Sequence, residues 1–150
     1  MHVLTSAGCS AAKALLAAIG VALSGCAIGE SPLEASQAGL SCVDDTPHCV
    51  SQRQATLKSM VADKERGWLK EPATPAAYAS GVRLFAYKST KKDLSCAELD
   101  QGRKEADGAP AALKVAGQFL TPAQVSRGVM FAGEVGRELG NEIKRRCKKG

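Results

Sequence analysis

Large aromatic side chains are scarce in this sequence of 150 residues, which holds three phenylalanines, two tyrosines and one tryptophan. Alanine and glycine are abundant instead. A core built from so few large groups is thin, so a stable fold needs closely packed elements and covalent cross-links. The length suits one domain rather than two.

Histidine is scarce, and the common catalytic motifs are absent. The two histidines are His2 and His48, and no two cysteines have the CxxC spacing. The chain contains neither the GxSxG nucleophile motif nor a glycine-rich phosphate-binding loop. A zinc site needs a tighter set of Cys and His ligands than this. We therefore expect no metal ion, no cofactor and no catalytic residue, and we expect His48 to be solvated or to cap a helix.

No apolar run is long enough to cross a membrane, which takes roughly 20 residues. The longest run, residues 14–25, follows Lys13 and leads into Leu23-Ser24-Gly25-Cys26. A positive charge, a short apolar core and small residues before the cleavage site are the parts of a signal peptide. Residues 1–26 thus resemble the type II signal peptide and lipobox of bacterial lipoproteins.

The resemblance implies that residues 1–25 are cleaved and that Cys26 carries a diacylglycerol and, on its new amino group, a further acyl chain such as palmitate. Several acyl chains hold a protein on a membrane permanently. Ala27 stands where an Asp would signal retention in the inner membrane of a Gram-negative cell, which favours the outer membrane, facing the periplasm. The alternative is an ordinary cleaved secretion signal with Cys26 unmodified.

Beyond the lipobox, the sequence predicts a tether and one all-α domain. Residues 26–41 contain several small residues and no sustained period, which is typical of a flexible tether. Residues 42–150 are predicted to form a bundle of about four helices. Thr46-Pro47 and Thr74-Pro75 each combine a capping side chain with a first-turn proline, and they open helices that extend to about residues 62 and 88.

The third predicted helix begins at a capping box formed by Ser95 and Glu98. We expect it to end near residue 107, because Pro110 follows two small residues. Residues 111–118 are predicted to be a short helix or an irregular return.

The fourth predicted helix begins at Thr121-Pro122 and is the clearest of the four. Apolar or small side chains repeat along it at steps of three and four, as in a helix of a bundle. They are Val125, Val129, Ala132, Gly136, Leu139, Ile143 and Cys147. A strip of small residues beside them is expected to admit another helix of the same domain at close range. Trp68, in the charged segment before the second helix, is expected to cover the core.

Four cysteines follow the lipobox, and an even number in a small exported domain indicates two disulfides. They are Cys42, Cys49, Cys96 and Cys147. Three pairings are possible. Cys96 opens the third helix and Cys147 closes the fourth, so antiparallel packing would place both at one end. This favours Cys96–Cys147 with Cys42–Cys49 over Cys42–Cys147 with Cys49–Cys96.

Basic side chains gather in two groups that the preferred disulfide would bring to one pole of the domain. They are Lys88, Lys91, Lys92, Lys144, Arg145, Arg146, Lys148 and Lys149. One hypothesis is that this pole binds an anionic envelope polymer such as lipopolysaccharide or peptidoglycan. The alternative is that cations at a helix C-terminus oppose the helix dipole and keep a free tail soluble.

Net charge gives no indication of a nucleic-acid partner. Removing residues 1–25 takes away one of 20 basic side chains, Lys13, and none of the 15 acidic ones, which leaves a formal charge of +4. The charge is modest and mixed in sign, so it fits an envelope protein better than a nucleic-acid-binding one.

The predicted function is a non-catalytic, membrane-anchored envelope lipoprotein that scaffolds or binds a partner. The alternatives are a binding module for an anionic polymer and an accessory or inhibitor subunit of an envelope complex.

The intact mass of the protein extracted from membranes tests the anchor and the disulfides together. We expect the mass of residues 26–150 plus three acyl chains, rising by about four hydrogens on reduction because two disulfides open. Cys26→Ser is the control, and it should abolish the added lipid mass. An unlipidated wild-type mass, or one that reduction leaves unchanged, contradicts the interpretation.

Overall fold

The computed structural model describes residues 32–147, with side chains from residue 37 onward. Within these residues the chain forms six α-helices, two short 3-10 helices and no strand, so the predicted all-α fold is confirmed with more helices than expected. The predicted signal peptide, residues 1–25, lies outside the described residues, as do Cys26, Lys148 and Lys149. The elements are α1 (Pro32–Ser41), α2 (Pro47–Ala62), η1 (Gly67–Leu69), α3 (Pro75–Ser80), α4 (Val82–Thr90), α5 (Cys96–Val115), η2 (Ala116–Gln118) and α6 (Pro122–Arg146).

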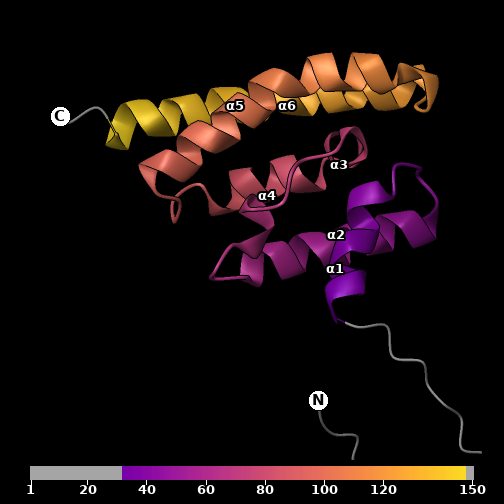
Figure 1. Cartoon of the computed structure of the whole chain (residues 1–150), viewed down its shortest axis with the longest axis horizontal. Helices are drawn as coiled ribbons and strands as arrows, with labels where there is room; N and C mark the ends of the chain where they lie inside the picture. The colour runs from indigo at the N-terminus through magenta and orange to yellow at the C-terminus, as the bar shows by residue number, and fades with distance from the viewer. Residues whose placement is uncertain (1–31, 148–150) are drawn as a thin grey trace, which may run out of the picture.

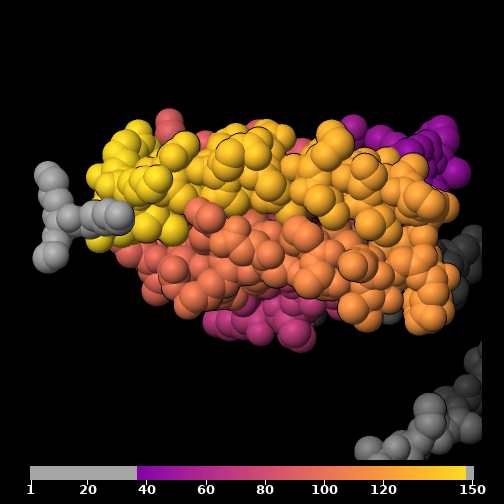
Figure 2. All heavy atoms as spheres, turned by 90° about the horizontal axis from the view of Figure 1, so that it is seen from above, coloured from indigo at the N-terminus to yellow at the C-terminus, as the bar shows by residue number. Residues whose placement is uncertain are grey.

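The α-helices stack in three layers of two (Figure 1). α1 and α2 form one outer layer, α3 and α4 the middle layer, and α5 and α6 the other outer layer. In a view onto the outer layer that they form, α5 and α6 lie side by side along the molecule (Figure 2). The α1–α2 connection also reaches α6, because Arg127 binds the Asp45 carboxylate at 2.7 Å and donates to the Val43 carbonyl at 2.8 Å.

The four predicted helix starts are confirmed. At each one a hydroxyl oxygen accepts a hydrogen bond from a main-chain N–H of the first turn, which would otherwise lack a partner. The capping residues are Thr46, Thr74, Ser95 and Thr121. The boxes at Ser95 and Thr121 are completed by Glu98 and Gln124, whose side chains accept from the cap N–H groups.

Residues 32–41, the second part of the predicted tether 26–41, form α1 instead. Gly39 packs against α2, and its N–H donates to the Thr56 hydroxyl at 3.1 Å. A Cβ atom on residue 39 would lie 2.5 Å from that oxygen, so only glycine allows the approach. The apolar pattern did not predict α1, because a glycine and a threonine make this contact in place of large apolar side chains.

The segment expected to be one helix from residue 74 to 88 is two helices, α3 and α4. Gly81 ends the first and begins the second with a φ of +77°, a left-handed conformation that glycine adopts without steric cost. The ring of Phe131 from α6 packs against Gly81 and meets Phe85 edge to face, with 4.8 Å between ring centres. The break therefore lets α6 approach the middle layer closely.

α5 continues through Pro110, where we expected the third helix to have ended. A proline inside a helix costs roughly 3 kcal/mol, because it removes a hydrogen bond and crowds the preceding turn. Ala109 and Leu113 are fully buried on the face of α5 that meets the core, and their burial offsets this cost. The predicted end near residue 107 and the separate segment 111–118 are therefore wrong.

Trp68 covers the core, as predicted. Its indole N–H donates to the Met60 carbonyl at 3.1 Å, and its ring meets that of Tyr87 edge to face with 4.9 Å between centres. The layers contribute large buried side chains, among them Met60, Tyr78, Leu84, Leu99, Leu113 and Leu139. Val129, which the apolar repeat of the fourth predicted helix placed inward, is exposed instead.

A charged pair is buried in this core, and the sequence pattern gave no sign of it. Arg83 of α4 is only 2% exposed and makes two hydrogen bonds to the Glu105 carboxylate of α5, at 2.6 and 2.7 Å. Arg83 also donates to the Trp68 carbonyl at 2.6 Å, and the Tyr87 hydroxyl donates to Glu105 at 2.8 Å. Burial raises the pKa of Tyr87, with the Glu105 charge adding to the shift, so the phenol stays neutral.

The preferred disulfide pairing is confirmed, with Cys42 bonded to Cys49 and Cys96 to Cys147. The second bond joins the start of α5 to the end of α6, which pack closely. The strip of small residues on α6 faces α5 as predicted, and it comprises Gly128, Ala132, Gly136 and Gly140. Between residues 32 and 147, no helix has both the length and the apolar character that a membrane span requires.

Two glycines of α5 test how far stability depends on close packing. A Cβ at Gly102 would lie 2.4 Å from the Tyr87 ring and 3.0 Å from Leu139, whereas a Cβ at Gly108 meets nothing within 4 Å. We expect Gly102→Ala to lower the free energy of unfolding by about 1–3 kcal/mol, since hydrogen bonding holds the ring in place. We expect Gly108→Ala to raise it by up to about 1 kcal/mol through helix propensity. Denaturant unfolding of both variants measures the difference, and equal effects would contradict the packing described.

Candidate functional site

The predicted basic residues that the structure describes meet at one end of the molecule, here called the basic pole. Its members are Lys88, Lys91, Lys92, Lys144, Arg145 and Arg146. The Cys96–Cys147 disulfide creates this end by joining the α4–α5 connection to the last turn of α6. Lys148 and Lys149 belong to the same predicted group and lie outside the described residues.

Carboxylates of α6 pair with two of these cations. Lys88 contacts Glu134 and lies 3.1 Å from a carboxylate oxygen of Glu138. Lys91 binds the other oxygen of Glu138. Hydrogen bonds from Lys91 and then Lys88 lower the pKa of Glu138, while the bond to Glu134 is the main cause of the raised pKa of Lys88. These two lysines therefore fasten the middle layer to α6 and contribute little unpaired charge.

Arg146 has a structural role at the pole. Its guanidinium donates to three main-chain carbonyls of the α4–α5 connection, at 2.6 to 3.1 Å. They belong to Lys91, Lys92 and Leu94. The Nε atom of Arg146 also lies 2.8 Å from the Glu142 carboxylate, which is buried (5% exposed). Arg146 thus satisfies carbonyl groups that the turn leaves without helical partners.

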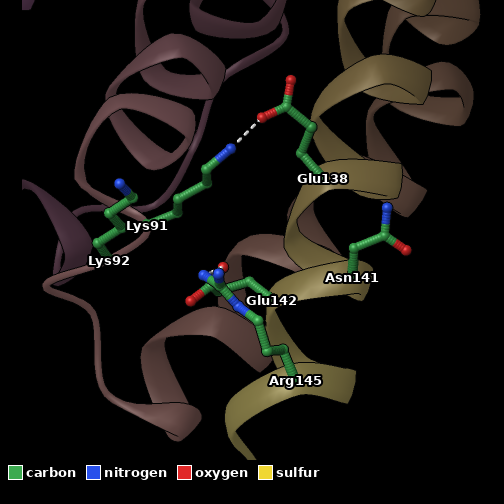
Figure 3. A pocket seen from close by; sticks show the side chains of 6 residues that line it. All are labelled: Lys91, Lys92, Glu138, Asn141, Glu142 and Arg145. Atoms are coloured by element: carbon green, nitrogen blue, oxygen red, sulfur yellow. Dashed lines mark hydrogen bonds and ion pairs between the residues drawn. The ribbon is translucent and has the colours of Figure 1, made fainter.

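A hollow of about 450 Å³ lies between the α4–α5 connection and α6 (Figure 3). It is lined by Lys91, Lys92, Glu138, Asn141, Glu142 and Arg145. Figure 3 shows Lys91 reaching across to Glu138 and the guanidinium of Arg145 lying against the Glu142 carboxylate. The walls therefore carry both signs of charge, arranged as neighbouring pairs.

Cations outnumber carboxylates at this pole. Four of the six basic side chains pair with Glu134, Glu138 and Glu142. Among the described residues, Lys92 and Lys144 make no ion pair. Arg145 and Arg146 share the single carboxylate of Glu142. The pole therefore keeps a positive excess that is available to an anion.

Sequence analysis did not predict a second surface feature, at the opposite end of the α5–α6 pair. Val115 and Phe119 are each 81% exposed, at the turn where α5 passes into α6. We call these two residues the apolar tip. The sequence predicts either a short helix or an irregular return for residues 111–118 and does not predict an exposed apolar pair there. Phe119, one of three phenylalanines in the chain, lies in a stretch without amphipathic spacing, and this could have indicated an exposed aromatic side chain.

The remaining residues singled out in the sequence are His48 and the four cysteines. His48 is exposed in the first turn of α2. Throughout the part of the chain that the structure describes, no three His, Cys, Asp or Glu side chains are placed to hold a metal ion. Both disulfides, not a metal, engage Cys42, Cys49, Cys96 and Cys147.

The ion pairs of Glu138 predict acid-sensitive stability. Because folding lowers the pKa of Glu138 below its ordinary value of 4.5, the unfolded chain takes up this proton first as the pH falls. The stability is fully present above pH 4.5 and is lost as the pH drops through the folded pKa. Glu138→Gln should therefore lower stability near neutral pH and flatten its loss on acidification.

Urea unfolding at neutral and acidic pH measures this effect. Glu71→Gln is the control, because the exposed Glu71 carboxylate makes no ion pair among the residues described. The same acid profile in Glu138→Gln and in the wild type would contradict the proposed linkage.

Comparison with known proteins adds no relative: no family model, no curated protein and no solved structure matches the chain. A function for it is therefore inferred from its own residues.

Proposed function

We propose that this protein is a bacterial lipoprotein that Cys26 anchors to a membrane of the cell envelope, where it binds a partner and does not catalyse a reaction. The favoured location is the outer membrane, with the domain facing the periplasm. The lipobox residues Leu23 to Cys26 support the anchor. The two disulfides support an oxidising compartment, since such bonds are rare where thiols are kept reduced.

The polar residues of the core support binding over catalysis. Arg83, Glu105 and Tyr87 bond to one another and to the Trp68 carbonyl, an arrangement that joins α4, α5 and η1. Their role is structural in this proposal.

The apolar tip is the observation that carries the partner-binding role. Val115 and Phe119 expose most of their apolar surface to water, in a domain that has few large side chains to spare. Aromatic side chains are enriched where proteins meet. The occupant we propose is a protein of the envelope. An accessory or inhibitor subunit of an envelope complex would be one form of this role, with the partner bound in fixed stoichiometry.

A second candidate function is binding of an anionic envelope polymer, either lipopolysaccharide or peptidoglycan, through the basic pole. The positive excess left by Lys92, Lys144 and the shared Glu142 favours it. The two functions respond differently to salt. Added salt screens charges at the pole and leaves apolar contact at the tip intact or stronger.

A photo-cross-linking amino acid in place of Phe119 tests the tip in intact cells. We expect one cross-linked product of defined mass, because a specific interface presents the same neighbour each time. Adding Val115→Ser should weaken that product, since it removes apolar contact area beside the probe. The control places the same amino acid at Ala55, an exposed residue of α2. No discrete product at residue 119, or the same product at residue 55, would contradict the proposed interface.

A further inference from the structure

We propose that the hollow at the basic pole binds a phosphate monoester, with Arg145 and Lys92 as the side chains that hold it. The inference deepens the second candidate function and rests on it. The hollow is open to solvent between the α4–α5 connection and α6. Its walls bring Lys92 and Arg145, from segments more than 50 residues apart in the sequence, to one place.

Arg145 donates a hydrogen bond to Glu142 but is not the only cation beside it, so it can change partners. The Glu142 carboxylate has a second partner in Arg146, which lies 2.8 Å from it. If Arg145 turns away, this buried carboxylate keeps one positive neighbour, so no isolated buried charge is left behind.

Because Arg145 is exposed, its move from Glu142 to an incoming anion costs little free energy. Its side chain is 65% exposed, and its contact with Glu142 joins residues one helical turn apart. Water can solvate this guanidinium when it leaves Glu142. An incoming anion therefore competes for a cation that is already in contact with solvent.

Arg146 cannot take over this role, which makes the two arginines unequal. Its guanidinium is already bonded to the carbonyls of Lys91, Lys92 and Leu94. Moving it would leave the α4–α5 connection without those bonds. Arg146 thus fixes the wall of the hollow that carries Lys92, and Arg145 supplies the adjustable ligand.

A phosphate monoester suits the hollow better than a carboxylate does. The incoming group has to win Arg145 from the carboxylate of Glu142, and it approaches a wall that also contains Glu138. A second carboxylate has no advantage in that competition. A phosphate monoester carries about −1.5 to −2 charges at pH 7 and offers three oxygens, so its attraction to Arg145 and Lys92 is stronger.

The volume indicates that the phosphate is one part of a larger ligand. The hollow of about 450 Å³ is of the size that accommodates small organic molecules, which is more room than a phosphate ion needs. A phosphorylated sugar and the headgroup of phosphatidic acid both carry a phosphate monoester. Both are found on membrane surfaces, so the source has to be identified by experiment.

Titration of the full lipidated protein in a non-ionic detergent tests the site. The probes are inorganic phosphate, glucosamine 1-phosphate and glycerol 3-phosphate, with acetate as the carboxylate control, and calorimetry measures binding. We expect saturable, salt-sensitive binding of the phosphates and none of acetate. Tighter binding of glucosamine 1-phosphate would identify a phosphorylated sugar, and tighter binding of glycerol 3-phosphate the headgroup of phosphatidic acid.

Matched variants locate the binding. Arg145→Gln and Lys92→Gln should each weaken it by about tenfold, the loss typical of one charge-assisted hydrogen bond. Arg137→Gln removes the same charge from an exposed position of α6, two turns earlier, and should leave binding unchanged. Circular dichroism of all three verifies folding. No saturable binding, or an equal loss in Arg137→Gln, would overturn the site.

Retention of the same protein on immobilised lipopolysaccharide separates this inference from the function on which it rests. Retention without phosphate binding would overturn the phosphate site and leave polymer binding standing. Phosphate binding without retention would support the site and remove lipopolysaccharide as its ligand.

Discussion

The buried pair of Arg83 and Glu105 is the interaction on which the three layers depend. A charge removed from water is stable only with a close partner and satisfied hydrogen bonds. The Glu105 carboxylate accepts hydrogen bonds from two of the three guanidinium nitrogens of Arg83 and from the Tyr87 hydroxyl. The third nitrogen of Arg83 donates to the Trp68 carbonyl. These groups come from α4, α5 and the η1 turn, so each element has to be in place before the charges are compensated. The network thereby joins α4, α5 and η1 in one relative arrangement.

Charges at the basic pole are also compensated mainly by groups of the protein itself. Lys88, Lys91 and Arg146 hold the layers together, which leaves Lys92, Lys144 and Arg145 as the charges for outside contact. One cluster therefore has both a structural and a surface part, and its formal charge overstates what a ligand meets. The two ends of the α5–α6 pair also differ in kind, since charge gathers at one end and apolar surface at the other.

Local signals in the sequence were sufficient for the helix starts, the disulfides and the position of Trp68, because hydroxyl caps, first-turn prolines and paired cysteines act within a few residues or at helix ends. The missed features depend on contacts that no local pattern records. α1 rests on a glycine against Thr56, the helix break at Gly81 leaves room for Phe131, and α5 passes Pro110 because Ala109 and Leu113 are buried. For the site, the sequence indicated which cations gather but not which of them Glu134, Glu138 and Glu142 would neutralise.

The Cys96–Cys147 bond closes a covalent ring that contains α5, the apolar tip and α6. A protease that cuts the exposed turn at Gly117 would therefore open the ring without releasing either fragment. The two helices would stay joined at the basic pole while the tip gained new chain ends. Cleavage at the apolar tip would thus leave the two fragments covalently joined for as long as the disulfide stays oxidised.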